Sequence, residues 1–401
     1  MIQIRAGMPS ASYQQHLKDQ NATLLFDLVR RRAPISRAEL TKASGLSAAT
    51  VTVLVDELLQ GGWLVELGAV GSTARGRRPI NLAVNAARGA VATLEILSNG
   101  SILSVYDICL HKLTQTRSRL PASTSAPVIA QLRTQLAALG LAEEQLLGIH
   151  ILYPGLIDAM TERLSFSAVI RSWQQCCPTI LPDFRAAFPD AYVMLSNNAA
   201  AVAYSAFLRD TEPPPLPLLV MTVQEGIDAG AVLPGGRSMP LEAGHISIDR
   251  NGPVCNCGNR GCLETFCSTT ALFARLRAAG IPVSYQDIYG SDPNEAAIAE
   301  LAVAFAAGDE AVTACLQRYG MDLCCAIVSL VNLLDVRAVR PGGFPYLLGE
   351  PFAELLRSML MEDFHILTST GELELQLFDC KYEDVRKAAV LQTLEAIFSR
   401  H

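Results

Sequence analysis

Four side chains able to hold a metal ion lie within eighteen residues of the chain: His245, Cys255, Cys257 and Cys262. Together they offer one imidazole and three thiols, and the glycines between them let the backbone turn tightly. Zn²⁺ in structural sites takes four tetrahedral nitrogen and sulfur ligands, which leaves no position for a catalytic water. The pattern therefore predicts a structural zinc site, with reduced, partly buried cysteines as the alternative.

Two carboxylates flank these metal-type residues. Glu242 precedes His245 by three residues, and Glu264 follows Cys262 by two. A metal that clamps this loop would also fix both carboxylates, in positions suited to paired hydrogen bonds with neighbouring sugar hydroxyl groups. Two solvated surface glutamates are the alternative.

The motif E-x-G-H at 242–245, followed by CNCGNRGCLE at 255–264, resembles the zinc-and-sugar segment of the ROK family. This family is named for repressors, open reading frames and kinases, and includes sugar kinases and Mlc- and NagC-like repressors. The resemblance implies an α/β fold with a two-lobed, actin-like (ribonuclease-H-like) body of the sugar-kinase type. It also implies a set of sugar-binding residues: Gly155, Asn197, Asn198, Glu242, His245 and Glu264.

The bulk composition indicates a globular protein with an uneven charge distribution. Half of the 401 residues are hydrophobic, and the net charge is −7. Residues 1–90 carry 11 Lys and Arg against 6 Asp and Glu, so this basic head has a charge of +5 and the remainder −12. A basic head on an acidic body suggests that the head alone meets a polyanion.

The chain has eleven cysteines, some of them adjacent, which indicates a reducing cytoplasm. We identify no signal peptide and no apolar run of membrane-spanning length, so no membrane insertion is expected.

The basic head has the pattern of a winged helix-turn-helix. Helices are expected at 21–31, 36–43 and 48–60, with a glycine turn at Gly45 between the second and third. Extended runs at 63–67 and 79–84 enclose an arginine-rich loop, which is the expected wing. A plain helical bundle is the alternative for the helices alone. PISRAELTKASGLSAATVTVLVDELLQGGWLVE and GRRPINLAVN also resemble the DNA-binding domain of ROK repressors.

The expected DNA contacts follow from that arrangement. The third helix would enter the major groove, and the wing would reach phosphates or the minor groove. The candidates are Arg37, Ser47, Ala48, Ala49, Thr50, Thr52, Arg75, Arg77 and Arg78. Small side chains at the start of the third helix favour apolar or hydroxyl contacts over arginine–guanine pairs.

After residue 88, short apolar strands alternate with helices, as expected for α/β lobes. The expected domains are 1–88 for the head, 89–196 for the first lobe and 197–380 for the second. The second lobe would carry the zinc loop and oligomer contacts. The resemblance implies that a C-terminal helix within 381–401 packs back on the first lobe.

Three kinase motifs of the family are altered here. The phosphate-binding turn matches residues 95–98, which lack both glycines. The second phosphate loop matches residues 224–230 and gains two negative charges. The Asn-Asp pair that holds the catalytic base is Asn197–Asn198, and an amide is no general base at neutral pH. The sequence therefore predicts no enzymatic activity.

These features together predict a cytoplasmic transcriptional regulator that represses genes for sugar uptake or catabolism. Its partners would be a double-stranded DNA operator and an inducer, which is a sugar, a sugar phosphate or a sugar-transport protein. A homodimer or homotetramer would present paired heads to half-sites about 34–36 Å apart. A sugar kinase with an added DNA-binding head is the disfavoured alternative, and a module that sequesters a transport protein is a third hypothesis.

Overall fold

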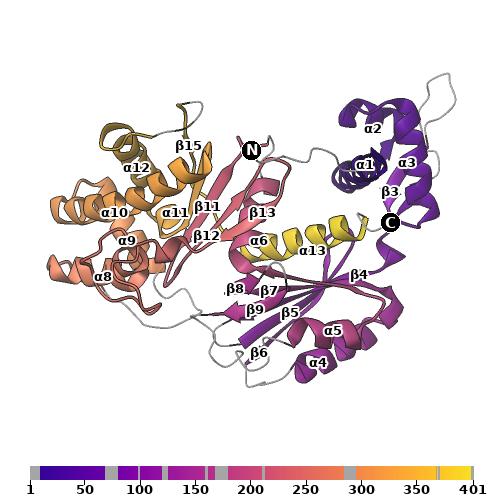
Figure 1. Cartoon of the computed structure of the whole chain (residues 1–401), viewed down its shortest axis with the longest axis horizontal. Helices are drawn as coiled ribbons and strands as arrows, with labels where there is room; N and C mark the ends of the chain where they lie inside the picture. Colours follow the sequence, from indigo (N-terminus) through magenta and orange to yellow (C-terminus); the bar gives the residue numbers. More distant parts are fainter. Residues whose placement is uncertain are drawn as a thin grey trace, which may run out of the picture.

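The computed structural model describes residues 10–67, 80–97, 100–119, 125–158, 161–167, 179–209, 213–283, 295–366, 368 and 371–398. Within these residues the chain forms a small helical head and two α/β lobes, each built on a five-stranded sheet. Figure 1 shows the head (indigo) at one end of the molecule and the second lobe (orange) at the other.

The head contains three helices and a three-stranded sheet. Its helices are α1 (Ser10–Arg32), α2 (Arg37–Ser44) and α3 (Ala48–Gln60), and its strands are β1 (Ile35–Ser36), β2 (Leu64–Leu67) and β3 (Asn81–Val84). The antiparallel sheet has the order β1-β3-β2. Ser36 and Glu39 form a reciprocal capping box at the start of α2, and Gly45 ends that helix at φ 69°. Ser47 caps α3 by accepting from the Thr50 amide.

The first helix, α1, is longer than the sequence predicts, because it begins eleven residues before the expected start. It also missed β1, which is only two residues long. The expected wing residues Arg75, Arg77 and Arg78 lie outside the described part of the chain.

The first lobe is a mixed sheet of order β10-β7-β4-β5-β6. Its strands are β4 (Ala90–Leu97), β5 (Gly100–Asp107), β6 (Lys112–Arg119), β7 (Leu146–Tyr153) and β10 (Tyr192–Asn197). Alternate residues of a strand face opposite sides of the sheet. Ala92 and Leu94 therefore pack with α4 (Ala126–Ala138) and α5 (Ile180–Ala187), whereas Val91 packs with α13 (Tyr382–Phe398).

The second lobe has the sheet order β13-β12-β11-β14-β15. Its strands are β11 (Leu218–Val223), β12 (Ile227–Val232), β13 (Ser238–Leu241), β14 (Ala338–Gly343) and β15 (Glu374–Leu375). Leu218 and Val220 face α6 (Asn198–Arg209), while Leu219 and Met221 face the opposite helical layer. That layer contains α8 (Thr269–Ala278), α9 (Glu295–Ala306), α10 (Glu310–Leu334), α11 (Phe344–Leu348) and α12 (Glu350–Glu362).

Helix α10 is longer than the expected 319–332, because Asp309 caps it by accepting from the Val312 amide. Among the described helices it alone has the length and apolar composition to cross a membrane, and 56% of that apolar window is buried inside the protein. It is a core helix of the second lobe.

Helix α13 contacts all three parts of the molecule. It packs on β4, β7 and β10 of the first lobe, on α6, and on α1 of the head. Figure 1 shows it (yellow) crossing the centre of the molecule towards the head. The Phe398 ring lies 5.1 Å from the Phe26 ring and 4.6 Å from the Trp63 ring, measured between centroids. Head and body therefore share one hydrophobic cluster.

Candidate functional site

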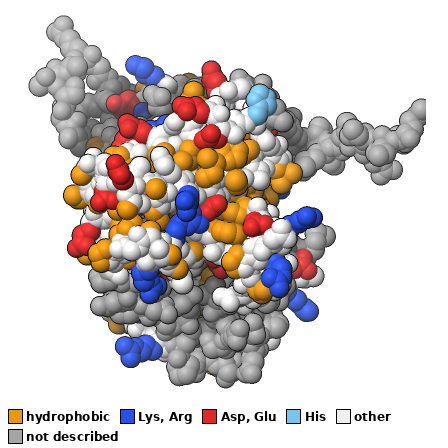
Figure 2. Space-filling view, turned by 90° about the vertical axis from the view of Figure 1, so that its left-hand side faces the viewer, with side chains coloured by type: hydrophobic (Ala, Val, Ile, Leu, Met, Phe, Trp, Pro, Cys, Tyr) orange, Lys and Arg blue, Asp and Glu red, His pale blue; other side chains and the backbone are white. Residues whose placement is uncertain are grey.

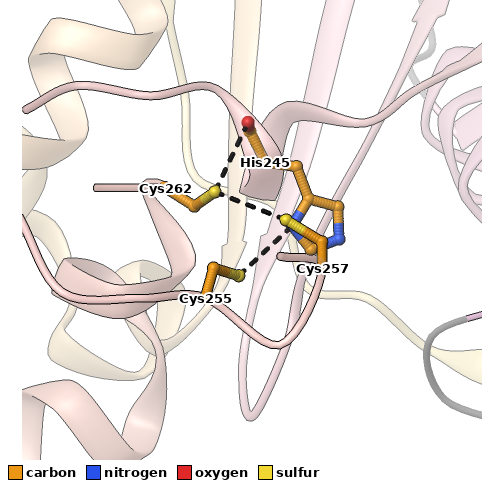
Figure 3. A group of neighbouring side chains, drawn as sticks. All are labelled: His245, Cys255, Cys257 and Cys262. Atoms are coloured by element: carbon orange, nitrogen blue, oxygen red, sulfur yellow. Dashed lines mark hydrogen bonds between the residues drawn. The ribbon is translucent and has the colours of Figure 1, made fainter. Parts of the chain in front are cut away.

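The four predicted metal ligands converge on one point. His245 ends a 3-10 helix (Ala243–His245), and the cysteines lie on the loop that follows. Their nitrogen and sulfur ligand atoms all lie within 4.8 Å of one another (Figure 3). Gly261 is required in this loop, because its φ is 64° and an added Cβ would lie 1.6 Å from the Asp249 carbonyl oxygen.

The spacing of these atoms fits a tetrahedral metal. The Cys257 and Cys262 sulfurs lie 3.6 Å apart, and Cys255 Sγ lies 3.7 Å from His245 Nδ1. Zinc–sulfur bonds of ~2.3 Å at the tetrahedral angle place two sulfurs ~3.8 Å apart. Cys267, also close in sequence, instead points its thiol at the Tyr319 carbonyl oxygen, 3.7 Å away. The donor set is therefore one histidine and three cysteines.

The thiols of this cluster differ in pKa: those of Cys255 and Cys262 are raised, whereas that of Cys257 is lowered, because its burial is outweighed by hydrogen bonds from the Asn259 backbone and from the two other thiols. Burial, ahead of the neighbouring thiols, raises the pKa of Cys262, and burial is also the largest cause of the raised pKa of Cys255. A metal ion binds the thiolate form, so loading the site would release protons.

A cavity of about 250 Å³ adjoins the metal cluster. Its lining residues are Gly155, Leu156, Ser167, Glu242, His245, Cys257 and Asn259. Three predicted sugar-binding residues, Gly155, Glu242 and His245, therefore meet at one cavity, and a cysteine ligand lies beside them. Asn197 supports the wall, because its Nδ2 donates to the Gly155 carbonyl oxygen at 2.7 Å.

Glu264 and Asn198 lie outside the lining of this cavity. The Glu264 carboxylate accepts from the Ile227 amide at 3.3 Å, which ties α7 (Glu264–Cys267) to the start of β12. Asn198 begins α6, and its Oδ1 is buried without a hydrogen-bond partner among the described residues.

The sequence missed four residues near this cavity. Leu156 and Ser167 line it and belong to no motif, and Asn259 also lines it, although only the cysteines and the glutamate of its motif were interpreted. Asp228 on β12 is solvent-exposed, yet the surrounding protein and then the charges of Glu242 and Glu264 raise its pKa to about 6, while His245 opposes the shift. A carboxylate surrounded by two others makes this side of the cleft unfavourable for phosphate.

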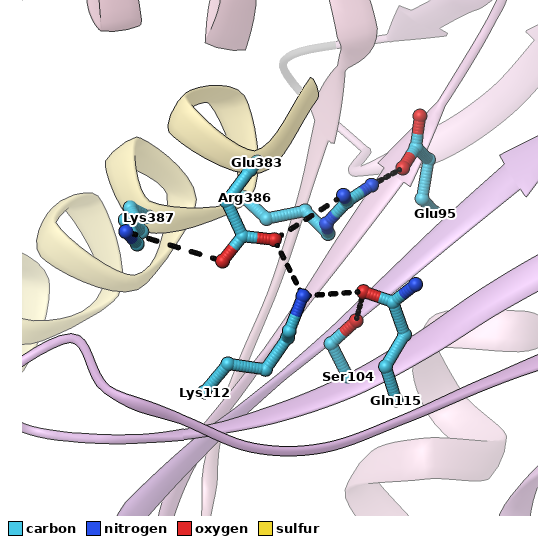
Figure 4. A network of polar contacts seen from close by, with 7 residues as sticks. All are labelled: Glu95, Ser104, Lys112, Gln115, Glu383, Arg386 and Lys387. Carbon is cyan, nitrogen blue, oxygen red and sulfur yellow. Dashed lines mark hydrogen bonds and ion pairs between the residues drawn. The ribbon is translucent and has the colours of Figure 1, made fainter. Parts of the chain in front are cut away.

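Glu95, the first residue of the segment that the sequence analysis matched to a phosphate turn, forms a buried ion pair. Arg386 Nη1 of α13 lies 2.7 Å from Glu95 Oε2 on β4, and both side chains are buried. Glu383, one turn before Arg386 on α13, bridges Arg386 and Lys112 (Figure 4). Burial raises the pKa of Glu95, and the positive charge of Arg386 opposes that shift.

The start of α3 presents a small, open surface. Ser47, Ala48, Ala49 and Thr52 are exposed, as expected, and Thr50 is half-buried. Val53 was missed by the sequence analysis, although its side chain is 55% exposed one turn beyond Ala49.

Arg37 does not project freely from the head. Its guanidinium pairs with Asp56 of α3 at 2.7 Å and lies 3.6 Å from Glu66 of β2.

Comparisons with known proteins identify the family. A family model described as the ROK family matches residues 103–365, and the chain belongs to this family. It is 28% identical over 338 residues to the xylose repressor of Bacillus subtilis (strain 168), covering 81% of this chain and 82% of that protein.

Two solved structures confirm the expected fold. A ROK family transcriptional regulator, described as a homologue of the E. coli MLC protein, matches with a TM-score of 0.70 and 23% identity. That match covers 96% of this chain and 98% of the other. A ROK hexokinase from Thermus thermophilus matches with a TM-score of 0.55 and 22% identity, over 75% of this chain and 97% of the other. The body has the actin-like fold of these proteins.

Proposed function

We propose that this protein is a cytoplasmic DNA-binding transcriptional repressor of genes for sugar uptake or catabolism. The observation that carries the proposal is the exposed face at the start of α3, held by two capped helices and a glycine turn at one end of a kinase-type body. Exposed alanines, Thr52 and Val53 suit apolar contact with thymine methyl groups in a major groove. The name of the Bacillus subtilis relative, a xylose repressor, supports the same function.

The body acts in this proposal as a sensor without phosphoryl transfer. The buried Glu95–Arg386 pair replaces the phosphate turn, and Asp228 puts a carboxylate where a second phosphate loop would lie. Asn198 stands in place of the family's catalytic aspartate and has no ionisable proton to exchange. A sugar kinase is the disfavoured alternative.

The inducer would bind in the cavity beside the metal cluster. Glu242 and His245 line this cavity, and Asn197 would act through its bond to Gly155. Asn198 and Glu264 would join the site on closure of the lobes. A structural Zn²⁺ held by His245, Cys255, Cys257 and Cys262 would fix the loop that carries these groups. A sugar, a sugar phosphate or a sugar-transport protein would be the signal.

Repression would use a homodimer or homotetramer, so that two heads read two half-sites. Figure 2 shows hydrophobic side chains between charged ones on the face formed by the second-lobe end of the molecule. Exposed apolar residues of this lobe include Val303, Leu333 and Met361.

The proposal includes the division of the chain into three domains: the head at 1–88, the first lobe at 89–196 with 381–401, and the second lobe at 197–380.

The test is selection of genomic DNA fragments by the purified full chain, with and without a panel of sugars. Enrichment of one locus and its release by one sugar would support both halves of the proposal. Absence of enrichment at modest salt would contradict the DNA-binding half. Turnover of ATP with mixed hexoses would support the kinase alternative. If the purified protein captures a sugar-transport protein from cell extract and no sugar releases the DNA, the signal would be that protein.

A further inference from the structure

A second cavity, of about 320 Å³, lies where the head meets the body. Three helices contribute charged side chains to it. Arg30 and Arg31 come from the last turn of α1, Arg209 from the end of α6, and Asp384 and Lys387 from α13. The cavity is separate from the one beside the metal cluster and shares no lining residue with it.

Positive charge exceeds negative charge in this cavity. Four of its ten lining residues are Lys or Arg, and one is Asp. Asp27 is shared by Arg30, at 2.5 Å, and Arg31, at 2.7 Å. Because one carboxylate serves two guanidinium groups, it neutralises only half of their charge.

Of the other carboxylates near the cavity, Glu395 accepts a hydrogen bond from Tyr204, whereas Asp379 and Glu383 are each shared between cations. Asp379 lies 3.1 Å from Lys381 and 3.8 Å from Arg209. The Glu383 carboxylate lies 3.0 Å from the Lys112 ammonium group and 4.0 Å from that of Lys387 (Figure 4). Glu383 therefore neutralises Lys387 less than it neutralises Lys112.

We propose that this cavity binds a small organic phosphate that also carries hydroxyl groups, of the sugar-phosphate class. Guanidinium and ammonium groups arriving from three directions suit the several oxygens of a phosphate monoester. Asp384 repels bare phosphate but accepts hydrogen bonds from hydroxyl groups, which is why the ligand is a phosphorylated polyol. The volume matches a small ligand, at the lower end of the ~300–1,000 Å³ typical of such pockets.

The position of this site connects the head with the sensor. Helix α6 begins at Asn198, directly after Asn197, which supports the wall of the cavity beside the metal cluster, and it ends at Arg209 in this second cavity. Next to the cavity, Tyr204 of α6 donates to Glu395 of α13 at 2.5 Å. A phosphate held by Arg31 on one side and by Arg209 and Lys387 on the other would fix the head on the body. This regulatory consequence rests on the proposed function, whereas the binding itself does not.

The test is calorimetric titration of the full chain with glucose 6-phosphate, at constant ionic strength. Glucose and inorganic phosphate are titrated separately. We expect glucose 6-phosphate to bind and to raise the unfolding temperature, with at least tenfold weaker binding in Arg209→Gln with Lys387→Gln. Arg31→Gln, on the head, should weaken binding in the same direction.

The matched control is Arg133→Gln with Arg185→Gln, two similarly exposed and ion-paired arginines of the first lobe. Equal loss of binding in this control, or unchanged binding in the Arg209/Lys387 variant, would overturn the proposal. So would absence of binding by folded wild-type protein, or equal affinity for inorganic phosphate. If the Arg209/Lys387 variant instead loses affinity for plain duplex DNA without ligand, these cations contact DNA and the proposal fails. None of these outcomes depends on fragment selection.

Discussion

The Arg386 guanidinium on α13 and the Glu95 carboxylate on β4 form an ion pair of 2.7 Å in which both side chains are buried. They are 291 residues apart in the sequence. The pair joins α13 directly to β4 of the first lobe.

Breaking this pair from one side should be costly. Arg386→Leu leaves a buried carboxylate without its counterion, so we expect a loss of about 3–5 kcal/mol in the free energy of unfolding. Urea denaturation at pH 7 measures it. The double variant Glu95→Leu with Arg386→Leu should recover most of the lost stability, because two apolar side chains leave no buried charge without a counterion. A double variant as unstable as the single one would contradict this account.

Removal of two thiols should empty the proposed zinc site. Cys257→Ser with Cys262→Ser leaves two of four ligands, and structural zinc in model peptides contributes ~10–16 kcal/mol of apparent binding free energy. We expect loss of the metal by elemental analysis and faster proteolysis within 245–262. Cys315→Ser, a buried cysteine of α10, is the control and should keep its metal. Wild-type protein free of zinc after purification without chelators would end this proposal.

Because one face of α3 is exposed, a substitution there should weaken DNA binding without changing the stability of the fold. Val53→Asp puts a negative charge on a side chain that is 55% exposed, so the unfolding temperature should change little. Repulsion by DNA phosphates should weaken operator binding at least tenfold, about 1.4 kcal/mol or more. Leu113→Asp, on β6 of the first lobe and 40% exposed, is the control and should bind normally. Normal binding by Val53→Asp would remove α3 from the DNA interface.

The wing makes its own prediction, based on the sequence alone. Arg77→Ala with Arg78→Ala should weaken binding about evenly across DNA sequences and flatten the dependence of log affinity on log salt. Each lost phosphate contact reduces that slope by about 0.9. An unchanged slope would exclude these arginines from phosphate contact.

A buried histidine predicts how stability depends on pH. His150 Nδ1 lies 2.8 Å from the Ala389 carbonyl oxygen of α13, and burial lowers the pKa of His150 to about 4. In the unfolded chain this pKa is 6.5. The unfolded state therefore binds the proton first as pH falls, and about 3 kcal/mol of stability is lost between pH 6.5 and 4.

His150→Gln should flatten the pH dependence in that window, while His365→Gln, an exposed control, should leave it unchanged. Denaturation midpoints measured from pH 4 to 7.5 make the comparison. If the denaturation midpoints of His150→Gln and of the wild-type protein fall in parallel as the pH is lowered, other groups cause the loss of stability in acid.

Local signals in the sequence account for the parts of the structure that local chemistry builds. Ser36, Gly45 and Ser47 set the limits of α2 and α3, and the glycines between the cysteines allow the metal-type loop to close. Contacts across long separations were not predictable. Ser167 and Asn259 meet at one cavity only because two lobes come together.

Helix α13 shows the same limit. Its buried residues lie on every side, including Arg386 and Thr393, so no single apolar stripe indicates its neighbours. The resemblance to the ROK family implied its packing on the first lobe, which the structure confirms, but only the folded chain reveals that the helix also reaches Phe26 of the head.

The contacts of Phe398 with Phe26 and Trp63 also bear on how the protein is made. A ribosome releases the head first and α13 last, so the head waits for nearly the whole chain before its own core is complete. A product of interrupted translation would carry α3 but expose the apolar patch that α13 covers. Such fragments would be marginally stable targets for proteases, and defective repressors would not accumulate on operators.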